Sequence, residues 1–133
     1  MKTCHLIATA MVCTLTMAAA ALAADPLRLV QTIPLAGVEG RIDHFALDAK
    51  GKRLFVAALG NNSVEVVDLT AGRVAQQIKD LQAPQGIGFA ADFNRLAVAN
   101  DKDGSVRLFD GTSLRPIHVI DLKQLNNWFF AIG

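Results

Sequence analysis

The sequence predicts an all-β fold built from four-stranded antiparallel sheets, and two observations indicate it. Residues 43–80 align without a gap on residues 85–122, at a constant offset of 42 positions. Among the 38 aligned pairs 11 are identical, whereas average composition gives about two or three. Within each copy, residues typical of turns separate short apolar runs about every eight to twelve positions, which is the pattern of consecutive short strands.

Each copy of the repeat holds four expected strands joined by tight turns. In the first copy, strands are expected at residues 44–48, 53–58, 63–68 and 73–78. In the second copy, they are expected at residues 86–90, 95–100, 105–110 and 116–120. The turns carry glycine, asparagine and aspartate, which tolerate a positive φ. Asp103-Gly104, for example, is a strong hairpin dipeptide.

The length and content of the repeat indicate β-propeller blades. A period near 40 residues with four strands per unit is typical of a blade, which buries its faces only against neighbouring blades. The strand at 63–68 is apolar on both faces, whereas a sheet wetted on one side alternates more strictly. The predicted fold is therefore a partial β-propeller with blades at 42–80 and 84–122. A duplicated β-sandwich is the alternative.

Two flanking segments extend this pattern within the expected domain, residues 25–133. Residues 29–35 resemble the fourth strand of a preceding blade, and residues 123–133 fall where a third blade begins. Propellers close with about four to eight blades, so two blades leave apolar faces open. We expect a truncated piece of a longer propeller. The alternative is a ring assembled from several copies.

Residues 1–24 have the features of a secretory signal peptide. Lys2 is the only formal charge among them, a long apolar run follows, and Ala21-Leu22-Ala23 supplies small residues in an A-x-A arrangement. A retained membrane anchor is the alternative, but the small residues at the end of the run favour cleavage near Ala23 or Ala24. We therefore expect a periplasmic or secreted protein with no membrane span after cleavage.

Removal of this leader changes the composition of the chain. Cys4 and Cys13 leave with it, so the mature chain holds no disulfide and no thiolate ligand. Lys2 leaves too, and the 13 basic residues become 12, which balance 12 acidic ones. A neutral balance argues against a nucleic-acid partner and against binding to an anionic membrane surface.

Two stretches of the repeat resemble a known family. The segments KRLFVAALGNNSVEVVDLTAGRV and NRLAVANDKDGSVRLFDGTSLRPI are similar to YVTN-type β-propeller repeats of the YncE-like secreted or periplasmic proteins. The resemblance covers about residues 28–122. It implies a ring of seven blades, most of which this chain lacks. The wider class includes binding scaffolds, lactonase-like enzymes and haem-binding propellers, and no motif here selects among them.

The candidate ligand-binding residues lie where the first strand of each copy starts. They are Arg41, Asp43 and His44, with Gln85 at the position equivalent to Asp43. In a closed ring such groups converge and suit a small polar ligand or a hard cation. The structural alternative is that Asp43 caps its loop or pairs with Arg41, while His44 packs between blades. Adjacent strand residues point to opposite faces, so Asp43 and His44 meet one ligand only at a bulge.

The expected function follows from the fold and the leader. We expect an exported β-propeller repeat protein that acts as a ligand- or protein-binding scaffold in the bacterial cell envelope. Its partner is an unknown small ligand or an envelope protein, and no catalytic residue, metal or cofactor is assigned. The alternative is a lactonase-like or metal-dependent propeller enzyme with a site at the channel mouth, centred on Asp43 or His44. A truncated product without activity is a third possibility.

Overall fold

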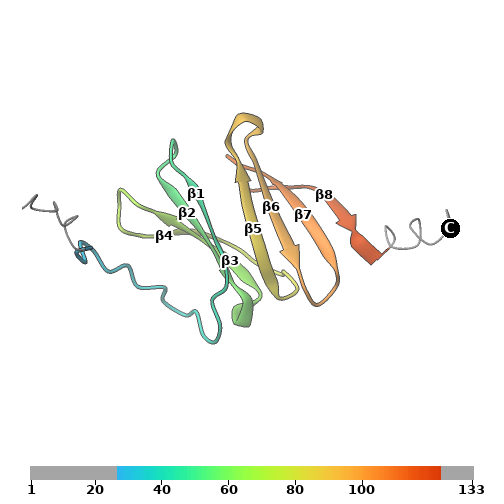
Figure 1. Cartoon of the computed structure of the whole chain (residues 1–133), viewed down its shortest axis with the longest axis horizontal. Helices are drawn as coiled ribbons and strands as arrows, with labels where there is room; N and C mark the ends of the chain where they lie inside the picture. Colours follow the sequence, from blue (N-terminus) through green and yellow to red (C-terminus); the bar gives the residue numbers. More distant parts are fainter. Residues whose placement is uncertain (1–26, 124–133) are drawn as a thin grey trace, which may run out of the picture.

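The computed structural model describes residues 27–123, which form two antiparallel four-stranded sheets (Figure 1). The first sheet contains β1 (Phe45–Asp48), β2 (Arg53–Ala58), β3 (Ser63–Asp68) and β4 (Arg73–Ile78). The second contains β5 (Pro84–Ala90), β6 (Arg95–Asn100), β7 (Ser105–Asp110) and β8 (Pro116–Asp121). Short 3₁₀ turns join β2 to β3 (η1, Leu59–Asn61) and β5 to β6 (η2, Ala91–Phe93). The predicted fold class, partial β-propeller, is confirmed.

The two sheets share one register, so the sequence repeat is also a structural repeat. Phe45 pairs with Val56 in the first sheet, and Ile87 pairs with Val98 in the second, at the same offset of 42. The ladder between the third and fourth strands also shifts at one equivalent point, after Val66 in β3 and after Leu108 in β7. Each copy thus folds as the same up-and-down meander.

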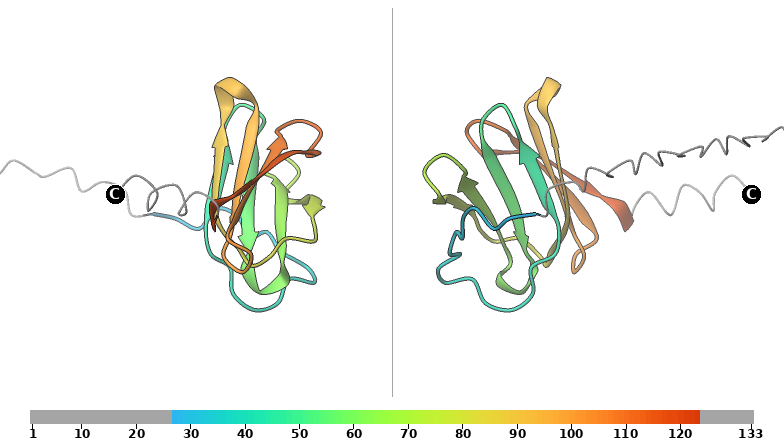
Figure 2. Two further views of the ribbon diagram at one scale, coloured as in Figure 1. Left: turned by 90° about the vertical axis from the view of Figure 1, so that its right-hand side faces the viewer. Right: turned by 60° about the vertical axis from the view of Figure 1, so that its left-hand side comes forward.

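The sheets stack face to face and bury one core between them (Figure 2). Ala46, Phe55 and Val66 lie side by side across β1, β2 and β3. The core between the sheets consists of Ala46, Phe55, Val64, Val66, Ile78, Leu81, Leu96, Val98 and Phe109, with Ile87, Phe89 and Leu114 against it. The ring centroids of Phe55 and Phe89 are 5.4 Å apart, within the range of favourable aromatic pairs.

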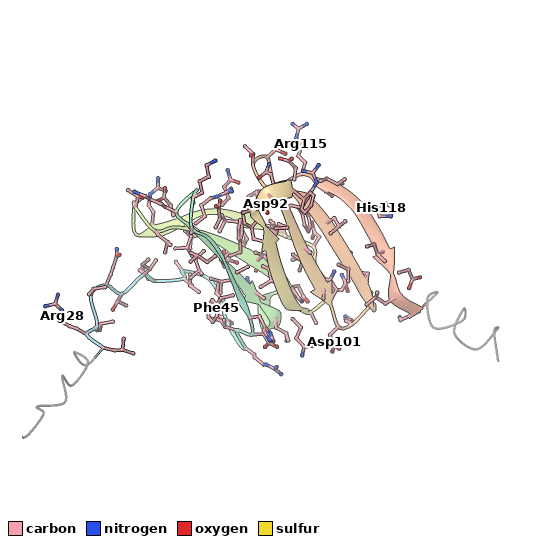
Figure 3. The ribbon with its side chains drawn as sticks, turned by 45° about the horizontal axis from the view of Figure 1, so that its top comes forward. Arg28, Phe45, Asp92, Asp101, Arg115 and His118 are labelled. Carbon is pink, nitrogen blue, oxygen red and sulfur yellow. The ribbon has the colours of Figure 1, made fainter. Side chains whose placement is uncertain are left out.

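The stacking joins two different faces of the repeat. Alternate residues of a strand line the same face of a sheet. Phe55 lies on one face of the first sheet. Phe89 of the second sheet is equivalent to Leu47, which lies on the opposite face of the first sheet. One face of the first sheet therefore packs on the opposite face of the second. The remaining face of the first sheet keeps apolar side chains in water, since Phe45 and Leu47 are each 57% exposed (Figure 3).

The predicted strand at residues 29–35 is wrong. Residues 27–35 hold no strand, and Leu29 and Val30 are 82% and 83% exposed. A strand exists only where a neighbour accepts its backbone hydrogen bonds, and no backbone hydrogen bond joins residues 27–35 to a described strand. Instead, the Gln31 side chain of this segment lies against Gly72, in the turn between β3 and β4.

Several expectations concern residues outside this range. The predicted leader, residues 1–24, and all but the first residue of the expected third-blade start, 123–133, lie outside the described residues. Within residues 27–123, no helix has the length and apolar content that crossing a membrane requires.

A buried aspartate, Asp48, stabilises the turn between β1 and β2. Asp48 Oδ1 accepts a hydrogen bond from the Gly51 N–H at 2.8 Å, and its Oδ2 accepts two from the Arg53 guanidinium, at 2.7 and 3.1 Å. Burial by itself raises the pKa of Asp48, but the Gly51 N–H and the Arg53 guanidinium outweigh it, so the pKa lies below its ordinary value of 3.8.

Three further aspartates show the same direction of pKa shift. Hydrogen bonds hold the pKa below 3.8, chiefly from the Ala71 and Thr70 N–H groups at Asp68, the Ser105 hydroxyl at Asp103, and the Ser113 N–H and hydroxyl at Asp110. A carboxylate with a lowered folded-state pKa stabilises the protein above its unfolded pKa and loses that effect as pH falls through its folded pKa.

We predict that stability is nearly constant above about pH 5 and falls steeply in acid. Replacing Asp48 with Asn removes charged hydrogen bonds and should lower the free energy of unfolding at pH 7 by about 1–3 kcal/mol. The variant should also show a weaker dependence on pH below about 4, because one titrating group is gone. Urea unfolding between pH 7 and 2.5 measures both effects. Parallel pH profiles for the variant and the wild type would contradict the assignment.

Candidate functional site

Loops from both sheets meet at one end of the molecule. The linker from β4 to β5 crosses to the η1 loop, where the Leu81 N–H donates to the Asn62 carbonyl at 3.0 Å and the Ala83 N–H donates to Asn62 Oδ1 at 2.9 Å. The segment before β1 joins the same loop, because the Gly60 N–H donates to the Arg41 carbonyl at 3.0 Å. Asp101 marks this end of the second sheet, and Asp92 marks the opposite end (Figure 3).

Three of the four predicted site residues form one cluster at this end. Asp43 Oδ2 accepts a hydrogen bond from Arg41 Nη2 at 2.7 Å, and Asp43 Oδ1 lies 2.8 Å from His44 Nδ1. The expected pairing of Arg41 with Asp43 is therefore present. Asp43 and His44 both precede β1, which begins at Phe45, so strand alternation does not separate their side chains.

Of the structural alternative for this cluster, the Arg41–Asp43 pair is present, whereas the packing of His44 and the capping by Asp43 are not. The His44 side chain is 65% exposed and does not pack between blades. Asp43 directs its two oxygens to the side chains of Arg41 and His44, where loop capping was expected. Because Asp43 faces Nδ1, the imidazole presents Nε2 to solvent, an arrangement that fixes the tautomer of a histidine base.

Gln85, the fourth predicted residue, lies apart from this cluster. It sits at an irregularity of the β5–β6 ladder, which pairs Pro84 with Asn100 and next pairs Ile87 with Val98. Gln85 lines a separate hollow of about 230 Å³ beside the loop between β6 and β7. Within the described residues, no hydrogen bond joins it to Arg41, Asp43 or His44. The convergence of Asp43 and Gln85 was expected for a closed ring and stays a prediction.

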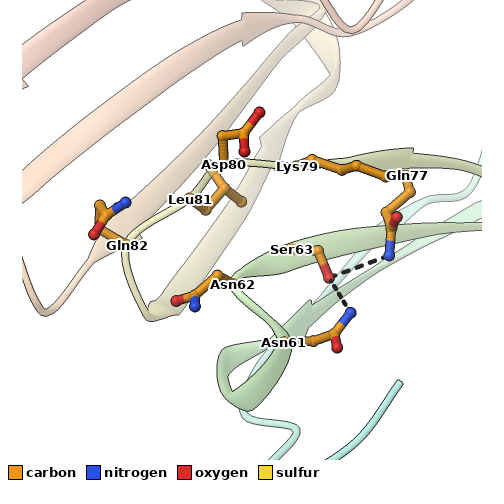
Figure 4. A pocket seen from close by; sticks show the side chains of 8 residues that line it. All are labelled: Asn61, Asn62, Ser63, Gln77, Lys79, Asp80, Leu81 and Gln82. Carbon is orange, nitrogen blue, oxygen red and sulfur yellow. Dashed lines mark hydrogen bonds between the residues drawn. The ribbon is translucent and has the colours of Figure 1, made fainter. Parts of the chain in front are cut away.

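A polar pocket that the sequence did not predict lies beside the linker (Figure 4). It has a volume of about 410 Å³ and is lined by Asn61, Asn62, Ser63, Gln77, Lys79, Asp80, Leu81 and Gln82. The η1 loop, the start of β3, the end of β4 and the linker each contribute to its wall. In the sequence, the asparagines indicate a turn, which does not by itself predict a pocket.

A buried carboxylate organises the wall of this pocket. Glu65 is 3% exposed, and its Oε1 accepts hydrogen bonds from Ser63 Oγ at 2.7 Å and Gln77 Nε2 at 2.6 Å. Asn61 Nδ2 donates to the same Ser63 Oγ at 3.1 Å. A carboxylate is costly to bury unless hydrogen-bond donors surround it. The buried Glu65 therefore fixes the positions of Ser63 and Gln77, which both donate to it.

The linker beside the pocket contains residues with a positive φ. Asp80 and Ala83 have φ of 59° and 54°, and Asn62 in the facing loop has φ of 54°. Such angles are uncommon outside glycine and asparagine, so the alanine is strained. Hydrogen bonds to both the backbone and the side chain of Asn62 hold the linker in place.

Within residues 27–123, no three histidine, cysteine, aspartate or glutamate side chains gather as a metal site would require.

Comparison with solved structures places the two sheets among β-propellers. The chain is similar to the β-propeller domain of Cps50 (Swd1) from Myceliophteria thermophila, with 17% identity and a TM-score of 0.54 over 62% of this chain. It is also similar to AztD from Citrobacter koseri, with 20% identity and a TM-score of 0.52 over 61% of this chain. Hydrazine synthase from Kuenenia stuttgartiensis matches with 24% identity and a TM-score of 0.53 over 58% of this chain.

These similarities show the fold alone. The chain spans 25%, 23% and 22% of those three structures, respectively. No family model matches the chain, so membership of the YVTN-repeat family stays a prediction. No curated protein matches it either.

We predict that the Asn62 side chain stabilises the linker beyond its tolerance of a positive φ. Asn62→Gly keeps the backbone angle but removes the acceptor of the Ala83 N–H, and it should lower the free energy of unfolding by about 1 kcal/mol or more. Asn94→Gly is the control, because Asn94 also has a positive φ, of 49°, after the other 3₁₀ turn, between β5 and β6, and its side chain donates one hydrogen bond, to the exposed Thr112 hydroxyl. Denaturant unfolding compares the two, and equal losses would contradict the prediction.

Proposed function

We propose that the chain belongs to an exported β-propeller that works as a binding scaffold of the bacterial cell envelope. In this proposal, a small polar ligand is held at the end of the sheets where the linker and the η1 loop meet. One observation carries it: amide, hydroxyl and charged side chains from the first sheet and the linker line a pocket of about 410 Å³ at that end. Ligand sites of about 300–1,000 Å³ with a few placed polar groups are typical of proteins.

The construction of the pocket supports a binding role. Its wall is held by the hydrogen bonds of Glu65 and Asn62 before any ligand arrives, and a preformed site loses less entropy on binding. The leader-like features of residues 1–24 support export, and the repeat motif supports a YncE-like scaffold.

The test measures binding to the full chain recovered from the periplasm of an expressing bacterium. After cleavage, its first residue should be Ala24 or Asp25. Glucose, glutamine, spermidine and citrate are the probes, and ligand-observed NMR gives the affinity of each. At least one probe should bind, and Gln77→Ala should weaken that binding about five- to tenfold, the effect of one lost hydrogen bond.

Gln76→Ala is the matched control for this test. Gln76 is adjacent to Gln77 on β4 but points to the other face of the sheet, so its replacement should leave binding unchanged. If no probe binds the folded wild-type chain, or if both variants bind as the wild type does, the pocket is not the binding site.

A second function is favoured by the contact between Asp43 and His44. The 2.8 Å separation of Asp43 Oδ1 and His44 Nδ1 is the geometry with which a carboxylate orients a histidine for general-base chemistry. We propose as the alternative that this cluster serves a lactonase-like hydrolysis, in which His44 Nε2 accepts a proton from the attacking water.

Turnover of a simple γ-lactone tests the alternative. His44→Ala should abolish activity, and Asp43→Asn should reduce it at least tenfold, because the imidazole loses its orienting partner. His118→Ala is the matched control, since His118 lies exposed on the outer strand β8 (Figure 3). Lactone hydrolysis that is absent from the wild type, or that survives in His44→Ala, would exclude the dyad.

A further inference from the structure

We propose that Glu65 is a positioning residue for the polar pocket, and that the pocket takes a neutral, hydroxyl-rich ligand such as a sugar or polyol. Glu65 holds the Gln77 amide so that the amide oxygen faces the pocket. This inference rests on the proposed function, because it names the ligand class of the same pocket.

The Gln77 amide is held in one direction by the carboxylate of Glu65. Its Nε2 donates to Glu65 Oε1 at 2.6 Å and approaches Ser63 Oγ at 3.4 Å. The nitrogen and oxygen of an amide lie on opposite sides of one carbon, so Oε1 turns away from the carboxylate. Figure 4 shows the nitrogen directed at Ser63 and the oxygen directed away from it. The pocket therefore meets a hydrogen-bond acceptor at this point.

Glu65 also fixes the direction of the Asn61 amide, through the Ser63 hydroxyl. The hydroxyl of Ser63 has one proton, which it donates to Glu65 Oε1 at 2.7 Å. Ser63 Oγ can then only accept from Asn61, and it receives the Asn61 Nδ2 donor at 3.1 Å. One buried carboxylate thus fixes the direction of two amides in the pocket wall.

This network occurs in only one of the two described blades. At the offset of 42, Arg107 replaces Glu65 and Val119 replaces Gln77, while Ser105 keeps the serine of Ser63. The second sheet folds in the same register without the pair. The carboxylate and the amide are therefore dispensable for making a blade, and their joint presence points to the pocket that they line or support.

The ligand class follows from the groups that line the pocket. Lys79 and Asp80 are its charged lining residues, and their opposite charges leave no net charge. Asn62 uses Oδ1 for the Ala83 N–H at 2.9 Å, so its Nδ2 remains a donor, whereas Gln77 offers an acceptor. A hydroxyl both donates and accepts, so a molecule rich in hydroxyl groups matches this mixture better than a cation or an anion.

The experiment uses glucose as the probe and the full chain as the protein. Glu65→Leu removes the acceptor and should weaken glucose binding about tenfold, since an oriented hydrogen bond is lost. Glu65→Gln keeps an amide oxygen in the same place and should bind glucose within about twofold of the wild type. Gln76→Ala serves again as the control that leaves binding unchanged.

A second readout reports the positioning itself. The side-chain N–H signals of Gln77 in a ¹H–¹⁵N NMR spectrum should exchange slowly with solvent in the wild type and in Glu65→Gln. They should exchange fast in Glu65→Leu. If Glu65→Leu does not fold, fast exchange in the folded Glu65→Gln variant, or in the wild type, overturns the proposal by itself.

The outcomes separate this inference from the proposed function. Equal glucose affinity of wild type and folded Glu65→Leu overturns the positioning role. Binding of spermidine or citrate, but not glucose, overturns the ligand class while a binding scaffold stands. Failure of all four probes to bind removes the proposed function and this inference with it.

Discussion

The stacking of one sheet on the other is the interaction on which the rest of the structure depends. A sheet with apolar side chains on both faces cannot shield either face alone. Phe55 is fully buried against Phe89 from the second layer. The guanidinium of Arg53 lies 5.3 Å and 6.0 Å from the centroids of these two rings, so it closes the edge of the core by cation–π contact. The same arginine binds the buried Asp48, which links the outer turn to the core.

The position of the polar pocket is a consequence of this stacking. Once the sheets lie as layers, the chain must cross from β4 to β5 at one end, and Leu81 anchors the crossing inside the core. The β2–β3 loop lies at the same end because the strands are antiparallel. The linker and the loop therefore meet, and mostly polar side chains line the space between them.

Local patterns in the sequence predicted the strands well, because turn residues and apolar runs act over a few positions. The strands at 53–58, 63–68, 95–100 and 105–110 agree with the structure. Such patterns failed for the segment at 29–35. Its residues resemble those of a strand, but a strand also requires a neighbour to pair with. The sequence does not reveal that this neighbour is absent from the described sheets. The Asp43–His44 contact was missed for a similar reason, since strand alternation was applied two residues before the strand begins. Glu65 and Gln77 are 12 positions apart, and the register of β3 on β4 alone makes them partners.

Because unlike faces of the repeat pack together, the two outer faces of the pair of sheets differ from each other. The face that carries Phe55 receives the face that carries Phe89 and Leu96, and the repeat leaves one face of each kind on the outside. Contacts that bring like faces together, as an isologous twofold dimer does, cannot reproduce this packing; only a heterologous, head-to-tail addition can. A further sheet that packs in this way therefore places its face on the unlike face of the previous sheet, with the same rotation between neighbouring sheets. A stack that grows by this rule has two non-equivalent ends, and the fit between those ends decides whether it closes on itself.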